Sequence, residues 1–245
     1  MAAIPLEKQP IEYPTSDGKP MAETTLHRVV MQDLIHGLES HFRTVPDVWV
    51  GGNLFLCYQE GNPGAALAPD VLFARGVAKY PRDNYLLWQE RPPSLIVEAT
   101  SRSTKREDFG KKKDIYQRIG IEEYVLFDPY GEYLKPRLQG YRLTRAGYEP
   151  MSLERDGGLL LRTTGLLLRP EGTRARLVEP GTGKLLPWPD EEAAVRQAAE
   201  AAHQAAEAAR QTAEAARQAA EERSRTLEDE VAHLRAELER SRKQD

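Results

Sequence analysis

The composition of the chain changes abruptly near Pro187-Trp188-Pro189. From residue 190 onward it contains no proline, glycine or aromatic residue and consists mainly of Ala, Glu, Gln and Arg. That composition is typical of a long helix or coiled coil, and it supplies too little apolar surface for a globular core. Within the 245 residues we therefore expect an extended segment at 1–20, one globular domain at 21–187 and an Ala-rich helix at 190–243.

Heptad repetition in this tail supports the helical prediction. Basic residues precede glutamates by four positions, a spacing that stabilises helices, and alanine fills the seam between them. Two interpretations remain open: a single exposed helix, or a coiled coil that joins two copies of the chain, and we favour the homodimer. The basic phase contains Arg196, His203, Arg210 and Arg217, the acidic phase Glu200, Glu207, Glu214 and Glu221, and the later apolar seam Leu227, Val231, Leu234 and Leu238.

The sequence also indicates the compartment. Cys57 is the single cysteine, so no intramolecular disulfide can form, and no Cys/His cluster has zinc-ligand spacing. The N-terminus lacks the apolar core of a signal peptide, and no run of about 18 apolar residues could span a membrane. We expect a cytoplasmic, soluble protein with no membrane partner.

The order of periodic segments in the body predicts a mixed α/β domain with a central sheet. Leu26, Val30, Leu34 and Leu38 mark a helix from about Ala22 to His41. A second helix is expected over Arg106–Ile119, ending at Gly120. Strands are expected at Val48–Val50, Asn53–Tyr58, Ala68–Ala74, Ser94–Ala99, Glu123–Phe127, Tyr141–Leu143, Leu159–Thr163 and Leu166–Arg169, with a bend at Gly51-Gly52.

Two carboxylates interrupt apolar strands. Asp70 precedes Val71-Leu72-Phe73, and Glu98 follows Leu95-Ile96-Val97. A charge in such a strand is costly unless it is paired or binds a metal. Each alone could be a strand-end residue in water, but two in one sheet favour a shared site for Mg²⁺ or Mn²⁺, which prefer oxygen ligands.

The second helix adds a lysine to this pair. At about 100° per residue, Lys112 shares a stripe with Tyr116 and the apolar residues that must face the sheet, and Asp108 lies close beside that stripe. Lys111 and Lys113 fall on the flanks. The period thus selects Lys112 as the inward-facing lysine, with Asp108 as a supporting i,i+4 partner. Tyr116 is expected to be a core residue with a hydrogen-bonded hydroxyl.

Charge is unevenly divided along the chain. The overall net charge is −4, but residues 190–245 account for −5 and the body carries +1. Basic residues crowd beside the candidate site, where they are either a solvated helix face or a phosphate-binding patch. The residues we expect to contact nucleic acid are Arg102, Lys105, Arg106 and Lys111.

At these positions the chain resembles the Uma-type restriction endonucleases of the PD-(D/E)xK nuclease superfamily, over roughly residues 13–185. The resemblance implies a restriction-endonuclease-like core, with a mixed sheet flanked by helices, and metal-dependent DNA cleavage. Thr100 stands where the superfamily usually has a lysine, and the resemblance implies that the helix supplies Lys112 instead. It also suggests Glu23 and His27 as site neighbours. The motifs are Pro69-Asp70, Ile96 to Thr104, Asp108 with Lys112 and Tyr116, and Gly120 to Tyr124 before Asp128-Pro129.

The sequence therefore predicts a metal-dependent endonuclease that hydrolyses DNA, with Asp70 and Glu98 as metal ligands and Asp70, Glu98 and Lys112 as catalytic residues. An alternative is an inactive nuclease-fold scaffold that associates through its coiled coil. RNA is a further possible substrate, because hydrolysis of the phosphodiester does not depend on the sugar.

Overall fold

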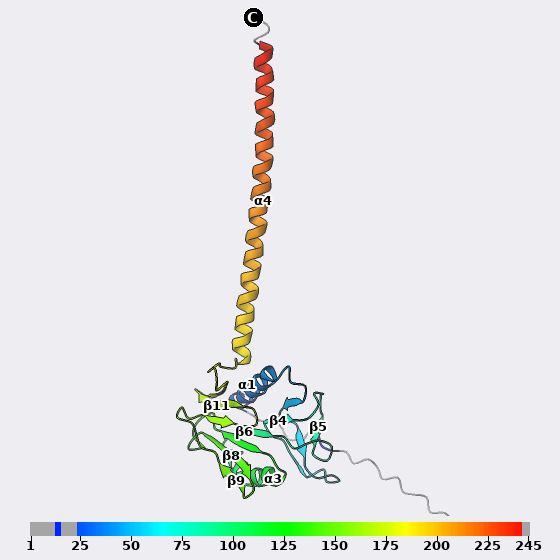
Figure 1. Ribbon diagram of the computed structural model, residues 1–245, viewed down its shortest axis with the longest axis vertical. Helices are drawn as coiled ribbons and strands as arrows, with labels where there is room; N and C mark the ends of the chain where they lie inside the picture. Colours follow the sequence, from blue (N-terminus) through cyan, green and yellow to red (C-terminus); the bar gives the residue numbers. More distant parts are fainter. Residues whose placement is uncertain (1–12, 16–23, 242–245) are drawn as a thin grey trace, which may run out of the picture. The chain divides into compact units, whose positions relative to one another are not determined.

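The computed structural model describes residues 13–15 and 24–241, and the chain forms two compact units, Met1–Pro189 and Asp190–Asp245 (Figure 1). Glu23 and most of the expected extended segment lie outside the described residues. The proposed extent of the nuclease-like domain, 21–187, stays a prediction.

A six-stranded sheet organises the first unit. Strands β6 (Leu95–Ala99) and β7 (Glu123–Phe127) pair in parallel and every other neighbouring pair is antiparallel, so the sheet is mixed, as predicted. The two parallel strands are buried along their whole length, which explains their continuous apolar runs. The spatial order is β1 (Val48–Gly51), β4 (Val71–Arg75), β6 (Leu95–Ala99), β7 (Glu123–Phe127), β8 (Leu138–Thr144) and β9 (Gly147–Pro150).

Two small sheets complete the unit. One contains β10 (Leu159–Leu161), β11 (Leu166–Glu171) and β12 (Arg174–Val178), and the other contains β3 (Ala66–Leu67), β2 (Phe55–Cys57) and β5 (Asn84–Leu86).

Helices cover both faces of the central sheet. Alternate strand residues point to opposite sides, so each face presents apolar side chains to a helix. Helix α1 (Thr25–His41) begins where Thr24 Oγ1 accepts a hydrogen bond from His27 N. It buries Val30, Leu34 and Leu38 on the face that contains Val71 and Val97. The opposite face, with Leu72, Ile96 and Tyr124, packs against helix α3 (Lys113–Arg118) through Ile115 and Tyr116. The predicted mixed α/β fold is confirmed.

Several predicted elements differ in detail. The strand expected at Ala68–Ala74 begins only at Val71, so Asp70 precedes the strand and does not interrupt it. The strand expected at Asn53–Tyr58 shortens to β2 and joins a separate sheet, because the chain turns at Gly51-Gly52 and Asn53 has a positive φ of 53°. The helix expected over 106–119 is not uniform. It consists of α2 (Lys105–Glu107), a π-helical turn η1 (Asp108–Lys112) and α3. Strands β3, β5, β9 and β12 were not predicted.

The second unit is a single helix, α4 (Pro189–Ser241), as the composition predicted. Leu227, Val231 and Leu234 are exposed on it. The coiled-coil pairing and the homodimer stay predictions. Across the described part of the chain, no helix combines the length and apolarity that a membrane span requires.

The link from β1 to β2 passes very close to the start of β4. Asn53 N donates to Pro69 O at 2.9 Å, and a Cβ added to Gly52 would lie 2.0 Å from Asp70 O. A backbone oxygen directly before a strand cannot move aside as a flexible side chain can. Glycine at position 52 therefore lets the chain pack against the segment that carries Asp70.

We expect Gly52→Ala to lower the free energy of unfolding by about 1–3 kcal/mol, the usual cost of overpacking. Urea denaturation measures the change. Gly181→Ala is the matched control, because a Cβ there meets no atom within 4 Å. Equal unfolding midpoints for the two variants would contradict the close approach.

Candidate functional site

The sheet register brings the two predicted carboxylates together. Val71 of β4 pairs with Val97 of β6 in an antiparallel ladder. Asp70 directly precedes β4 and so lies just beyond this last pair, at the end of β6 that carries Glu98. The two acids, 28 positions apart in the sequence, thus form one site.

The Asp70 carboxylate is held from two sides. One oxygen, Oδ1, lies 3.0 Å from His27 Nε2 near the start of α1, and Oδ2 accepts a hydrogen bond from Ala99 N at 2.7 Å. The backbone N–H of Ala99 points toward β4, and the carboxylate takes the position that a further ladder residue would occupy. His27, predicted as a site neighbour, therefore lies at the site.

Glu98 is buried, with 1% of its surface exposed, and both of its oxygens have partners. Tyr116 OH donates to Oε1 at 2.8 Å, and Lys112 Nζ lies 2.9 Å from Oε2. Lys112 Nζ also lies 3.3 Å from Asp108 Oδ1. The ammonium is thus placed between two buried carboxylates, which offsets the high cost of removing these charges from water.

The charge states follow from burial and from these neighbours. Burial raises the pKa of the Glu98 carboxyl, and the ammonium of Lys112 opposes that shift. Burial alone would lower the pKa of Lys112, but Glu98, Asp108 and Asp70 outweigh it and raise the pKa above its usual value. Lys112 is therefore an ammonium at neutral pH. Burial also raises the pKa of Tyr116, so its hydroxyl remains a hydrogen-bond donor.

The π-helical turn shapes the approach of the lysine. A π-turn closes over one more residue than an α-turn, and such turns are frequent at functional sites. Here it contains both Asp108 and Lys112, so the angular relation between them differs from the α-helical spacing assumed in the prediction. Lys112 nevertheless contacts both Asp108 and Glu98. In addition, Tyr124 OH donates to Asp108 O at 2.9 Å. Sequence reasoning included Tyr124 and Ala99 in the motifs but gave no role to the Tyr124 hydroxyl or the Ala99 N–H.

The residues predicted to contact nucleic acid lie between Glu98 and Lys112 in the chain. They are exposed on the loop after β6 and on the helical segment that follows it. Ser101 N donates to Thr104 Oγ1 at 3.0 Å and Thr104 N donates to Ser101 Oγ at 3.3 Å, which fixes the loop. The exposed basic residues there are Arg102, Lys105, Arg106 and Lys111.

The donor set fits a hard divalent cation. Two carboxylates supply four oxygens, and each oxygen keeps a lone pair beyond the contact described above. Within residues 13–15 and 24–241, no three His, Cys, Asp or Glu side chains gather into a metal cage. Mg²⁺ commonly binds through one or two carboxylates together with water and substrate phosphate. Asp70 and Glu98 match that mode.

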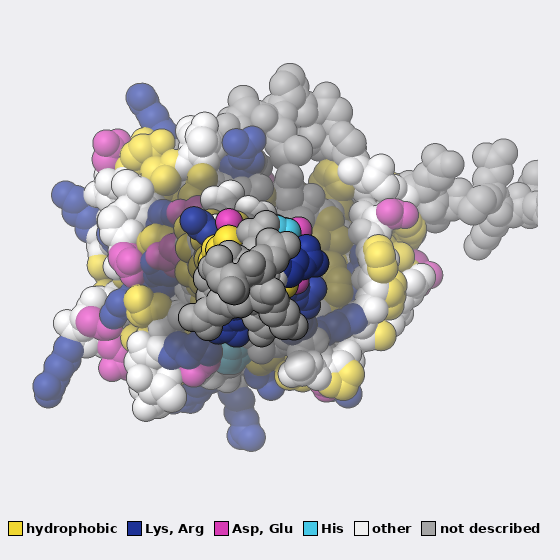
Figure 2. Space-filling model, turned by 90° about the horizontal axis from the view of Figure 1, so that it is seen from above, with side chains coloured by type: hydrophobic (Ala, Val, Ile, Leu, Met, Phe, Trp, Pro, Cys, Tyr) yellow, Lys and Arg dark blue, Asp and Glu magenta, His cyan; other side chains and the backbone are white. Residues whose placement is uncertain are grey.

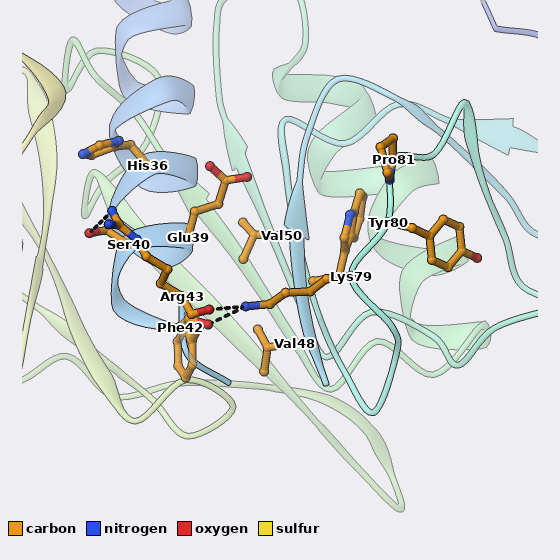
Figure 3. Close-up of a pocket in the computed structure, with 11 residues that line it drawn as sticks. His36, Glu39, Ser40, Phe42, Arg43, Val48, Val50, Lys79, Tyr80 and Pro81 are labelled. Atoms are coloured by element: carbon orange, nitrogen blue, oxygen red, sulfur yellow. Dashed lines mark hydrogen bonds between the residues drawn. The ribbon is translucent and has the colours of Figure 1, made fainter. Parts of the chain in front are cut away.

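A separate groove of about 520 Å³ lies between the second half of α1, strand β1 and the loop at Lys79–Pro81 (Figure 3). Lys79 Nζ crosses it and donates to Phe42 O at 2.7 Å and Arg43 O at 3.0 Å, which satisfies the end of α1. None of the predicted site residues lines this groove.

On the face shown in Figure 2, Lys and Arg are interspersed with Asp and Glu rather than gathered in one patch.

Comparison with known proteins identifies the family. A solved structure of a putative nuclease belonging to DUF820 from Anabaena variabilis is similar, with 15% identity and a TM-score of 0.44, over 60% of this chain and 76% of that one. No curated protein matches the chain. The model of the Uma2 family, described as "Putative restriction endonuclease", matches residues 2–169. Since this match spans well over half of the sequence, the chain belongs to the Uma2 family.

Proposed function

We propose that this protein is a divalent-metal-dependent endonuclease that hydrolyses phosphodiester bonds in DNA. The observation that carries the proposal is the convergence of Asp70, Glu98 and Lys112, with the Lys112 ammonium 2.9 Å from Glu98. Membership of a family described as restriction endonucleases supports the reaction class.

Asp70 and Glu98 would hold the cation, Mg²⁺ or Mn²⁺. When bound, such an ion polarises a phosphoryl oxygen and lowers the pKa of a coordinated water. His27 orients the Asp70 carboxylate, and Tyr116 orients Glu98. Both carboxylates are therefore fixed before substrate arrives, which limits the reorganisation needed during the reaction.

Lys112 supplies a fixed positive charge beside the two carboxylates. In hydrolysis the water oxygen forms a new bond to phosphorus, the bond to the leaving oxygen breaks, and negative charge grows on the phosphoryl oxygens. An ammonium placed in advance stabilises that charge or orients the attacking water. Asp108 keeps Lys112 charged and in place. The lysine reaches the site from the helix, whereas Thr100 occupies the position two residues after Glu98.

The exposed basic residues beside the site would bind the phosphate backbone, in keeping with the near-neutral charge of the body despite an acidic tail. The chemistry involves no sugar hydroxyl, so assays should compare DNA with RNA.

The cytoplasmic setting remains a prediction of the sequence.

A specific observation favours the alternative of an inactive scaffold: Thr100 has replaced the usual lysine, and its buried hydroxyl has no hydrogen-bond partner among the described residues. The two functions differ in metal binding and cleavage. The α4 helix would contribute association in either case.

We expect purified protein to nick plasmid DNA with Mg²⁺ or Mn²⁺, and Asp70→Asn or Lys112→Ala to lower kcat by about 10²–10³-fold, as loss of one preorganised charge-stabilising group does. Gel electrophoresis of supercoiled plasmid measures the rate. Lys111→Ala is the matched control, since this neighbouring lysine is exposed, and it should retain turnover at saturating DNA.

Calorimetric titration with Mn²⁺ separates the two functions. Binding by the wild type that is lost in Glu98→Ala supports the nuclease. Metal-independent cleavage, or cleavage unchanged in Asp70→Asn, would refute it. Absence of both Mn²⁺ binding and cleavage would favour the scaffold.

Replacing Arg102, Lys105 and Arg106 by alanine should weaken DNA binding and flatten its dependence on salt. Each lost phosphate contact reduces the slope of log K against log [salt] by about 0.9 for duplex DNA. Fluorescence anisotropy at several NaCl concentrations gives the slope. Lys184→Ala, at a lysine that is 68% exposed on the loop after β12, should leave it unchanged, and an equal effect there would argue against a local patch.

We further propose that two copies associate through the apolar seam of α4, which contains Leu227, Val231 and Leu234. Leu234→Lys in the full chain should convert a dimer into monomer, because a charge at a seam position of a coiled coil opposes burial. Light scattering measures the mass. Ala236→Lys, at an exposed position on the other side of the helix, is the control. A wild type that is already monomeric at working concentration would refute the dimer.

A further inference from the structure

A backbone carbonyl of the π-turn η1 has a partner outside the helix. In an α-helix each carbonyl accepts from the N–H four residues later, and in a π-helix from the N–H five residues later. A carbonyl oxygen has two lone pairs, and that of Asp108 accepts a hydrogen bond from Tyr124 OH at 2.9 Å. Tyr124 belongs to β7, so a residue of the sheet contacts the helix backbone at the point where the helical turn widens.

Tyr124 has little freedom to place its hydroxyl elsewhere. Its side chain is fully buried, and its ring packs against Tyr116, Tyr141 and Tyr148 with centroid distances of 5.1, 6.3 and 6.2 Å. Tyr124 pairs with Ile96 in the parallel ladder of β6 and β7. Ile96 lies two residues before Glu98 on β6, and the two side chains point to the same face of the sheet. The hydroxyl is therefore held against η1 by the same sheet that carries the candidate site.

The conformation of η1 decides how the lysine meets that site. Asp108 begins the turn and Lys112 ends it, and the two side chains form an ion pair at 3.3 Å. If the turn relaxed to α-helix, the Asp108 carbonyl would bond to Lys112 N, and Asp108 would rotate relative to Lys112. The direction of the Lys112 side chain relative to Asp108 would change, and with it the geometry that holds the ammonium between Asp108 and Glu98.

We propose that Tyr124 is a positioning residue: its hydroxyl stabilises the π-turn through the Asp108 carbonyl and thereby fixes Lys112 between Glu98 and Asp108. The part of this inference that concerns turnover rests on the proposed nuclease function. The part that concerns the placement of Lys112 does not.

The test compares Tyr124→Phe with Tyr148→Phe in the full chain. Tyr148 is a matched control, because it lies in the same ring cluster and its hydroxyl donates to another backbone carbonyl, Ile121 O, at 2.9 Å. The first readout is the rate at which an acylating reagent modifies Lys112, followed by peptide mass spectrometry. We expect Tyr124→Phe to raise this rate several-fold, with no change at Lys111, and Tyr148→Phe to leave it at the wild-type value.

The second readout is cleavage kinetics. Tyr124→Phe should lower kcat by about 10–100-fold with KM for DNA unchanged, the scale expected when a catalytic group is misplaced by about 1 Å. In a Lys112→Ala background the same substitution should have no further effect on kcat. A merely structural role would give Tyr124→Phe and Tyr148→Phe the same loss, and a further loss in the Lys112→Ala background.

The outcomes separate the two ideas. If the wild type cleaves DNA but Tyr124→Phe matches Tyr148→Phe in both readouts, the positioning role is overturned and the nuclease stands. If the wild type does not cleave, the proposed function fails, and the labelling of Lys112 still decides the positioning role. Should Tyr124→Phe not fold, p-methylphenylalanine at 124 fills the volume without donating, and p-aminophenylalanine, which donates, should restore the protection of Lys112.

Discussion

The buried carboxylate of Glu98 is the constraint on which the rest of the site depends. A charge with 1% exposure is tolerated only if partners compensate its lost hydration, and removing one partner of a buried pair typically costs about 3–5 kcal/mol. The compensation comes from Lys112 and the hydroxyl of Tyr116, both carried by the helical segment that covers the sheet. The contacts of Glu98 with Lys112 and Tyr116 therefore join the helix to the strand and form the site.

This arrangement links packing with chemistry. Ile115 and Tyr116 bury their side chains against the central sheet, and the same docking brings Lys112 to Glu98. On the other side of the sheet, α1 packs through its apolar stripe and brings His27 to Asp70. Each helix thus contributes a polar residue from its edge while its apolar face supplies the stability. A site built on packed elements keeps its geometry without relying on flexible loops.

Periodicity and strand patterns identified the central elements because they reflect local requirements. The apolar runs at β4, β6 and β7 predicted buried strands. The helical period selected Lys112 from three consecutive lysines. The same reasoning failed where non-local contacts decide the conformation. Nothing in the local sequence reveals that the turn at Asp108 is π-helical, and the hydroxyl that donates to its carbonyl comes from Tyr124 on a strand that follows in the chain. Short strands such as β5 also escaped prediction, since their partners lie far away in the sequence.

The sequence by itself determined the fold class, the long terminal helix and the candidate set of Asp70, Glu98 and Lys112. The period of the apolar residues, and charged residues beside apolar runs, can be recognised without knowledge of the tertiary structure. Only the tertiary structure decided how these residues meet. The antiparallel pairing of β4 with β6 brings Asp70 to the end of the strand that carries Glu98, the Ala99 N–H and His27 orient Asp70, and the π-turn contains both Asp108 and Lys112. Register and turn geometry depend on contacts between segments distant in the chain, and that is why no local pattern contains them.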